Sequence, residues 1–114
     1  MFNVSLDIHQ NASFVKDFVW KTGVDQTPVN LTGCSAVMEI RSTDGTLVLT
    51  LSTSNTRLVL GTTDGKIKIS ISKVDTSSIP EGDYVYDLMV DFPSTQRTKL
   101  LEGVVQVQSS VTKV

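Results

Sequence analysis

The sequence predicts an all-β fold, an immunoglobulin-like sandwich of two antiparallel sheets with about 8 strands and at most one short helical turn, near Asp75–Ile79. Residues 83–92 alternate in polarity, Val, Thr and Ser are abundant, and turn signals recur at intervals of roughly 8 to 12 residues. A chain of 114 residues has the size of one domain, which we assign to residues 1–114.

The stretch IPEGDYVYDLMVDF, residues 79–92, has the strongest strand pattern. Because successive side chains in a strand point to opposite faces, one face is predicted to hold a set of large apolar residues, namely Tyr84, Tyr86, Leu88, Val90 and Phe92. The opposite face holds Asp83, Val85, Asp87, Met89 and Asp91. Pro80 and Gly82, just before Tyr84, are typical of a chain that crosses between the sheets of an immunoglobulin-like sandwich.

The residues before this stretch form short apolar alternations separated by turn residues. They predict strands at Val4–Ile8, Ala12–Trp20, Cys34–Ser42, Thr46–Ser52, Arg57–Leu60 and Lys66–Ser72. The predicted turns are Asp44-Gly45, Ser54-Asn55 and Asp64-Gly65, and Thr22–Asn30 is predicted as a loop. Lys16 is an exception, because it shares the predicted inward face with Phe14 and Phe18.

The remaining elements follow from local signals. The side-chain oxygens of Asp75–Ser78 can cap one helical turn before Pro80. Pro93–Gln96 predicts the last turn and Arg97–Val111 the last strand. In this strand the alternating apolar residues change from an even position, Leu100, to the odd positions Val105 and Val107. Gly103 lies where this change occurs, so we predict a β-bulge there.

Composition excludes several kinds of partner. A net charge of −2 with 19% charged residues provides no strong positive field, so we expect no binding to nucleic acid. No segment has the run of roughly 18 apolar residues that a membrane span needs, and the first ten residues lack a secretory pattern, so we expect no membrane contact and no export. The single cysteine, Cys34, cannot form an internal disulfide, which suits folding in a reducing cytoplasm.

No residue pattern predicts an enzyme, a cofactor or a metal site. His9 has no acid or nucleophile near it in sequence, so a surface position is expected, and Cys34 is expected to be a small packing residue. Asp83, Asp87 and Asp91 stand about 13 Å apart from neighbour to neighbour in an extended strand, too far to share one ion. The Gly61–Gly65 turn lacks the Lys-Ser/Thr pair of a phosphate-binding loop.

Two groups of residues are candidates for binding. Val37, Val85 and Met89 are apolar residues on predicted outward faces, which suggests a contact surface for another protein. Trp20, beside the predicted loop, either stacks on a ligand such as a sugar or is the large core residue of the sandwich.

The order of segments resembles a family of small tailed-bacteriophage virion proteins. The resemblance rests on QNASF, TPVNLTGCSAVMEIRS, GKIKISIS, TSSIPEGDYVYDL and KLLEGVVQVQSSVT. It is similar in layout to the immunoglobulin-like N-terminal domains of phage baseplate and tail-fibre attachment proteins, in which a Pro-Val-Asp/Asn-Leu-Thr-Gly run precedes a Met-x-Ile-Arg strand. Here these are residues 28–33 and 38–41.

The resemblance implies a structural subunit of the virion that contacts other virion proteins and copies of itself in a symmetric assembly. It would be a tail, neck or baseplate adaptor, or a capsid decoration or cement subunit. Because the chain ends at Val114, soon after its last predicted strand, we do not expect it to recognise a host by itself. The alternative is a carbohydrate- or receptor-binding sandwich module, with Trp20 as its stacking residue.

Overall fold

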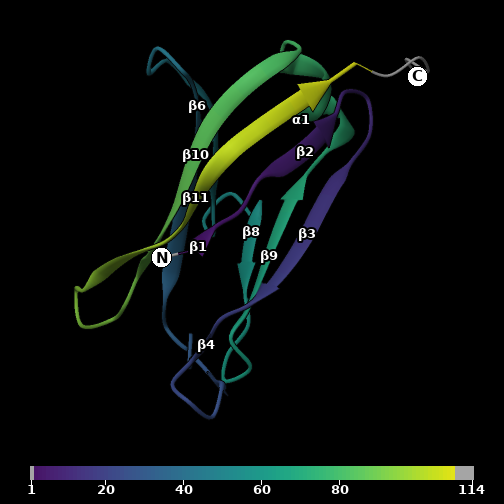
Figure 1. Ribbon diagram of the computed structural model, residues 1–114. Coiled ribbons are helices and arrows are strands. Elements are labelled where there is room, and N and C mark those ends of the chain that lie inside the picture. Colours follow the sequence, from purple (N-terminus) through teal and green to yellow (C-terminus); the bar gives the residue numbers. More distant parts are fainter. Residues whose placement is uncertain (1, 110–114) are drawn as a thin grey trace.

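The computed structural model describes residues 2–109 and contains two main β-sheets packed face to face. Figure 1 shows the long strands β10 and β11 in one layer and β3, β9 and β8 in the other. This confirms the all-β sandwich. Eight strands have three or more residues, as the sequence predicted, and three further strands have two residues each.

The larger sheet has six strands, in the order β1-β11-β10-β6-β7, with β2 also paired to β11. The strands are β1 (Phe2–Asn3), β2 (Leu6–His9), β6 (Ser35–Ser42), β7 (Leu47–Ser52), β10 (Gly82–Asp91) and β11 (Arg97–Gln108). The pairings among β11, β10, β6 and β7 are antiparallel, whereas β1 and β2 run parallel to β11. The residues after Ser109 lie outside the described part of the chain, and with them the predicted end of the last strand at Val111.

The smaller sheet has three antiparallel strands in the order β3-β9-β8. They are β3 (Phe14–Val19), β9 (Lys66–Ile71) and β8 (Leu58–Leu60). A separate ribbon pairs β4 (Lys21–Thr22) with β5 (Thr27–Pro28) and overlaps the segment Thr22–Asn30 that was predicted as a loop. Lys16 lies in β3, an edge strand, which explains how a charge on the inward parity reaches solvent.

The core lies between the two sheets and confirms the predicted parity of residues 84–90. Tyr84, Tyr86, Leu88 and Val90 are all buried, and across from them lie the alternate isoleucines of β9, Ile67, Ile69 and Ile71, none of which is exposed. Each completely buried aliphatic side chain contributes roughly 1.5–3 kcal/mol of transfer free energy. This one-sided burial fixes which residues of β10 face outward.

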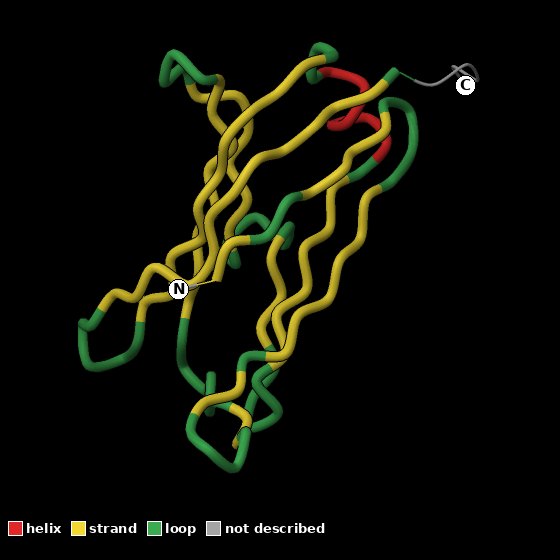
Figure 2. Tube along the Cα trace, in the orientation of Figure 1, coloured by secondary structure: helices red, strands yellow, loops and turns green. Residues whose placement is uncertain are grey.

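The chain crosses from the smaller to the larger sheet between β9 and β10, as Pro80 and Gly82 predicted. The crossing contains the single helix of the described residues, α1 (Lys73–Ser78), shown in red in Figure 2. Ser72 caps it by accepting a hydrogen bond from the Asp75 amide at 3.2 Å, so the helix begins earlier than predicted. At the far end of the crossing, Tyr84 Oη donates a 2.6 Å hydrogen bond to the Pro80 carbonyl, the tyrosine corner of this fold class.

The predicted β-bulge at Gly103 is wrong. Gly103 pairs regularly with Tyr86, and the register of β10 against β11 shifts instead at Leu88/Met89, which pair with Leu101 and Lys99. Leu100 is therefore the extra residue. The parity changes there because the bulge allows Leu100 and Leu101, consecutive in sequence, both to be buried.

Candidate protein-interaction face

The outward surface of the six-stranded sheet, which we call the A face, is arranged in three adjacent rows that each cross β7, β6, β10 and β11. The first row is Leu47, Arg41, Val85 and Val104. The second is Thr50, Glu39, Asp87 and Glu102. The third is Ser52, Val37, Met89 and Lys99. Asp83, Asp91 and Arg97 extend the face along β10 and β11, and Asp7 extends it along β2.

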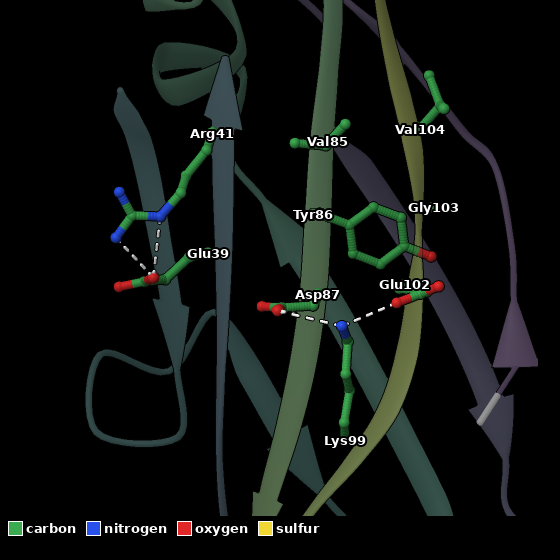
Figure 3. A pocket seen from close by; sticks show the side chains of 9 residues that line it. All are labelled: Glu39, Arg41, Val85, Tyr86, Asp87, Lys99, Glu102, Gly103 and Val104. Atoms are coloured by element: carbon green, nitrogen blue, oxygen red, sulfur yellow. Dashed lines mark hydrogen bonds and ion pairs between the residues drawn. The ribbon is translucent and has the colours of Figure 1, made fainter. Parts of the chain in front are cut away.

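The second row places three carboxylates in neighbouring register positions. Glu39 and Glu102 flank Asp87, an arrangement that is repulsive unless cations lie close by. Cations from the adjacent rows neutralise these carboxylates (Figure 3). Lys99 Nζ lies 2.8 Å from Glu102 Oε1 and 3.8 Å from Asp87 Oδ2. Arg41 Nη2 lies 2.9 Å from Glu39 Oε1. The hydrogen bond to Glu102, and then the charges of Glu102 and Asp87, raise the pKa of Lys99.

A second ion pair lies at the end of the β10–β11 hairpin. Arg97 Nε donates to Asp91 Oδ1 at 2.5 Å, and Nη2 donates to Oδ2 at 2.9 Å. The hydrogen bond from Arg97 lowers the pKa of Asp91. Two aspartates of β10 thus pair across the hairpin, Asp91 with Arg97 and Asp87 with Lys99.

The apolar residues of the A face lie on both sides of the carboxylate row. Val37 and Met89, predicted as interface residues, are direct register partners and are half-buried. Val85 is 42% exposed and its partner Val104 is also 42% exposed. Leu47, 46% exposed, completes the first row. Sequence reasoning missed Leu47 and Val104, since each becomes part of this surface only through the register of its strand.

The centre of the A face is hollowed. A depression of about 440 Å³ is lined by the ion-paired side chains and by Val85, Tyr86 and Val104 (Figure 3). Gly103, between Glu102 and Val104 in β11, also lines it. The A face thus combines exposed apolar groups with charges held in fixed positions, which suits contact with another folded surface.

Comparison with known proteins agrees with the sandwich. The family described as "LtfC-like, beta-sandwich domain" matches residues 3–108. The chain belongs to this family. No curated protein matches it.

Two solved structures similar to this LtfC-like domain share little sequence identity with it. CopC from Methylosinus trichosporium OB3b superposes with a TM-score of 0.51 at 14% identity, covering 94% of this chain and 88% of that chain. Drosophila OTK, extracellular domains 3–5, gives a TM-score of 0.38 at 15% identity, covering 90% of this chain and 32% of that chain. The likeness to CopC supports the fold alone.

Trp20 of the LtfC-like domain lies directly after β3 and is half-buried. Its ring centroid is 6.0 Å from that of Phe92, with the planes tilted by 57°. Its backbone is held on both sides, since the Trp20 amide donates to the Gly65 carbonyl and the Trp20 carbonyl accepts from Val29. Beside the ring is an apolar pocket of about 170 Å³, lined by Val4, Phe18, Val19, Trp20, Leu100 and Leu101.

The structure places His9 and Cys34 apart from the A-face depression. His9 is exposed at the end of β2, opposite Gln108. Cys34 is half-buried just before β6, and burial raises the pKa of its thiol. Within residues 2–109, no three His, Cys, Asp or Glu side chains are arranged to hold a metal ion, and no helix is long and apolar enough to span a membrane.

Proposed function

We propose that this LtfC-like domain is a non-catalytic structural component of a bacteriophage particle, and that it acts through protein–protein contacts made by the A face. It would be a tail, neck or baseplate adaptor, or a capsid decoration subunit, folded in the host cytoplasm before assembly. The layout of the sequence, similar to phage baseplate and tail-fibre attachment domains, supports the virion context. The A face supports the mode of action.

The observation that carries the proposal is the register of the A face. Val85 and Val104 form an exposed apolar pair on one side of the carboxylate row, and Val37 and Met89 form a second pair on the other side. Single exposed valines are ordinary on protein surfaces, but apolar pairs aligned by the strand register form a surface that another protein can cover.

The sheet edges are less suited to the same task. Thr50 in the edge strand β7 already accepts hydrogen bonds through its carbonyl from Asn55 Nδ2 at 3.0 Å and Arg57 Nη1 at 3.1 Å. The edge strand β3 carries Lys16 on its inward parity, where it obstructs an added strand. These features favour the face over the edges as the contact surface.

A carbohydrate- or receptor-binding module is the alternative. It would need aromatic side chains standing free on the surface. Trp20 instead packs against Phe92, and the pocket beside it is lined by apolar side chains. No other observation favours sugar binding over protein contact.

The first test is the composition of purified particles. Particles released after induction of the phage that encodes this chain are purified by density gradient and analysed by mass spectrometry and by gold labelling of the domain. The proposal expects a fixed copy number per particle and a label at one location. A protein found only in the soluble lysate would refute it.

The second test uses single substitutions on the A face. Met89→Asp and Val85→Asp place a charge in each apolar pair, and incorporation into particles should fall by roughly tenfold or more, as for burial of an unpaired charge in an interface. Val24→Asp is the matched control, because Val24 is 100% exposed in the β4–β5 loop. Unfolding curves of the isolated variants check folding, and normal incorporation of folded Met89→Asp and Val85→Asp would contradict the proposal.

A further inference from the structure

We propose that the A face binds the opposite outer surface of a second copy of this chain. That surface, which we call the B face, is the outward side of the three-stranded sheet. It consists of Val15, Asp17, Val19, Val59, Lys66 and Lys68. The inference rests on the proposed function in one respect, that the A face is covered in the assembled state, and it names what covers it.

Both faces expose aliphatic side chains to a similar extent. On the B face, Val15 is 54% exposed, Val19 49% and Val59 50%. On the A face, Leu47 is 46% exposed, and Val85 and Val104 are each 42% exposed. Among residues 2–109, two other large apolar side chains are strongly exposed and lie outside both faces. They are Val24 in a loop and Val74 in α1. The strongly exposed apolar side chains thus gather on the two flat surfaces of the sandwich, where they can pack against each other.

The charges of the two faces are complementary. On the A face the acidic side chains outnumber Arg41, Arg97 and Lys99; they are Asp7, Glu39, Asp83, Asp87, Asp91 and Glu102. On the B face, Lys66 and Lys68 outnumber Asp17. Neither lysine forms an ion pair within the described part of the chain, so both ammonium groups are available to the carboxylates of a second copy. Opposite net charge steers the two faces together and disfavours contact of either face with itself.

The B face is narrow enough to fit within the A face. Strands lie about 4.8 Å apart, so the outer strands of the three-stranded B face are about 10 Å apart, whereas β7 to β1 in the A face spans roughly 19 Å. The narrower sheet therefore fits within the wider one, over the depression lined by Val85 and Val104. Because so narrow a contact buries less area than a standard interface, a single contact is expected to be weak and to depend on repetition in the particle.

The two faces lie on opposite sides of the sandwich, in the two layers of Figure 1. Each copy then offers one A face and one B face, which is a heterologous, head-to-tail contact. Such contacts produce a ring when the rotation closes and a stack when it does not.

The test is charge reversal with rescue, measured by sedimentation from about 10 μM to 1 mM, the range in which weak contacts become populated. The wild-type domain should show a mass that rises with concentration and falls again in high salt. Asp83→Lys/Asp87→Lys alters only the A face and Lys66→Glu/Lys68→Glu only the B face, so each variant alone should remain monomeric. An equal mixture of the two variants should associate again. The altered A face of one variant then meets the altered B face of the other, which has the opposite charge, and the unaltered A and B faces still complement each other.

Two further measurements make the result decisive. Lys21→Glu/Lys73→Glu carries the same charge change off both faces and should associate like wild type. In a Cys34→Ser background, Val85→Cys mixed with Val59→Cys should form a disulfide-linked heterodimer, whereas Val85→Cys alone should not form a homodimer. A domain that stays monomeric to 1 mM, a mixture that fails to associate, or a Val85→Cys homodimer would overturn the inference.

The two proposals fail separately. If the protein is found in particles but does not associate with itself, the particle role stands and the A face is covered by a different protein. If it associates head to tail but is absent from particles, the inference about the faces stands and the proposed function is lost.

Discussion

The phenol of Tyr86 donates a 2.6 Å hydrogen bond to the carbonyl oxygen of Val4, 82 positions earlier in the chain. Gly103 lies between them, as the register partner of Tyr86 in β11. The Val4 carbonyl occupies the space that a Cβ on Gly103 would need. The N-terminal segment is therefore attached to the sheet at the break between β1 and β2. Two of these residues, Tyr86 and Gly103, also line the depression of the A face.

Tyr86→Phe should destabilise the domain. The substitution removes the hydroxyl and leaves the Val4 carbonyl without this partner in a site where Tyr86 is only 4% exposed. An unpaired buried acceptor costs about 1–3 kcal/mol, so the free energy of unfolding in urea should fall by that amount. Val85→Thr, on the outward parity of the same strand, is the control for a change in β10 that leaves this bond intact. Equal stability of Tyr86→Phe and wild type would show that the bond contributes nothing.

The same phenol should make stability depend on pH in the alkaline range. Burial raises the pKa of Tyr86 to about 12, from an ordinary value of 10.0. Because the folded-state pKa is the higher one, the contribution is fully present below pH 10 and is lost as pH rises toward 12. The difference in unfolding free energy between wild type and Tyr86→Phe should shrink by about 2 kcal/mol across that window. A difference that stays constant from pH 9 to pH 12 would contradict the raised pKa.

Gly103→Ala should displace the N-terminal strands. The new Cβ would meet the backbone of Val4, which cannot rotate away, and overpacking of this kind costs about 1–3 kcal/mol. Gly61→Ala is the matched control, because the nearest obstacle there is the flexible carboxylate of Asp64. Hydrogen exchange should show faster exchange at the Val4 amide, which donates to Glu102. A Gly103→Ala variant as stable as Gly61→Ala would show that the segment adapts.

The sequence alone predicted the features that depend on neighbours along the chain. The parity of β10 was predictable because strand side chains alternate and one face is buried, so Tyr84 and Leu88 had to point inward if Val85 pointed outward. The crossing between the sheets was predictable from local signals too, since Pro80 and Gly82 lie just before Tyr84, whereas the hydrogen bond from Tyr84 to Pro80 was seen only in the structure.

Features that depend on register between distant strands were not predictable. The row of Glu39, Asp87 and Glu102 exists only because β6, β10 and β11 align at these positions. The bulge at Leu100 shifts the pairing of everything before it in β11, and the sequence shows only a change of parity that Gly103 could equally have explained. Val104 likewise belongs to the A face because β11 places it opposite Val85 in β10.

Lys99→Gln should make the stability of the domain depend on salt. Lys99 is the cation between Glu102 and Asp87, so its loss leaves the carboxylate row with Arg41 as its nearest counter-charge. The urea midpoint should fall at low ionic strength and recover toward the wild-type value at high salt, which screens the remaining repulsion. Lys66→Gln, which removes a lysine without an ion pair among residues 2–109, should leave the midpoint nearly unchanged at both salt concentrations. A Lys99→Gln midpoint that falls equally at low and high salt would mean that Lys99 acts through the packing of its aliphatic chain and not through its charge.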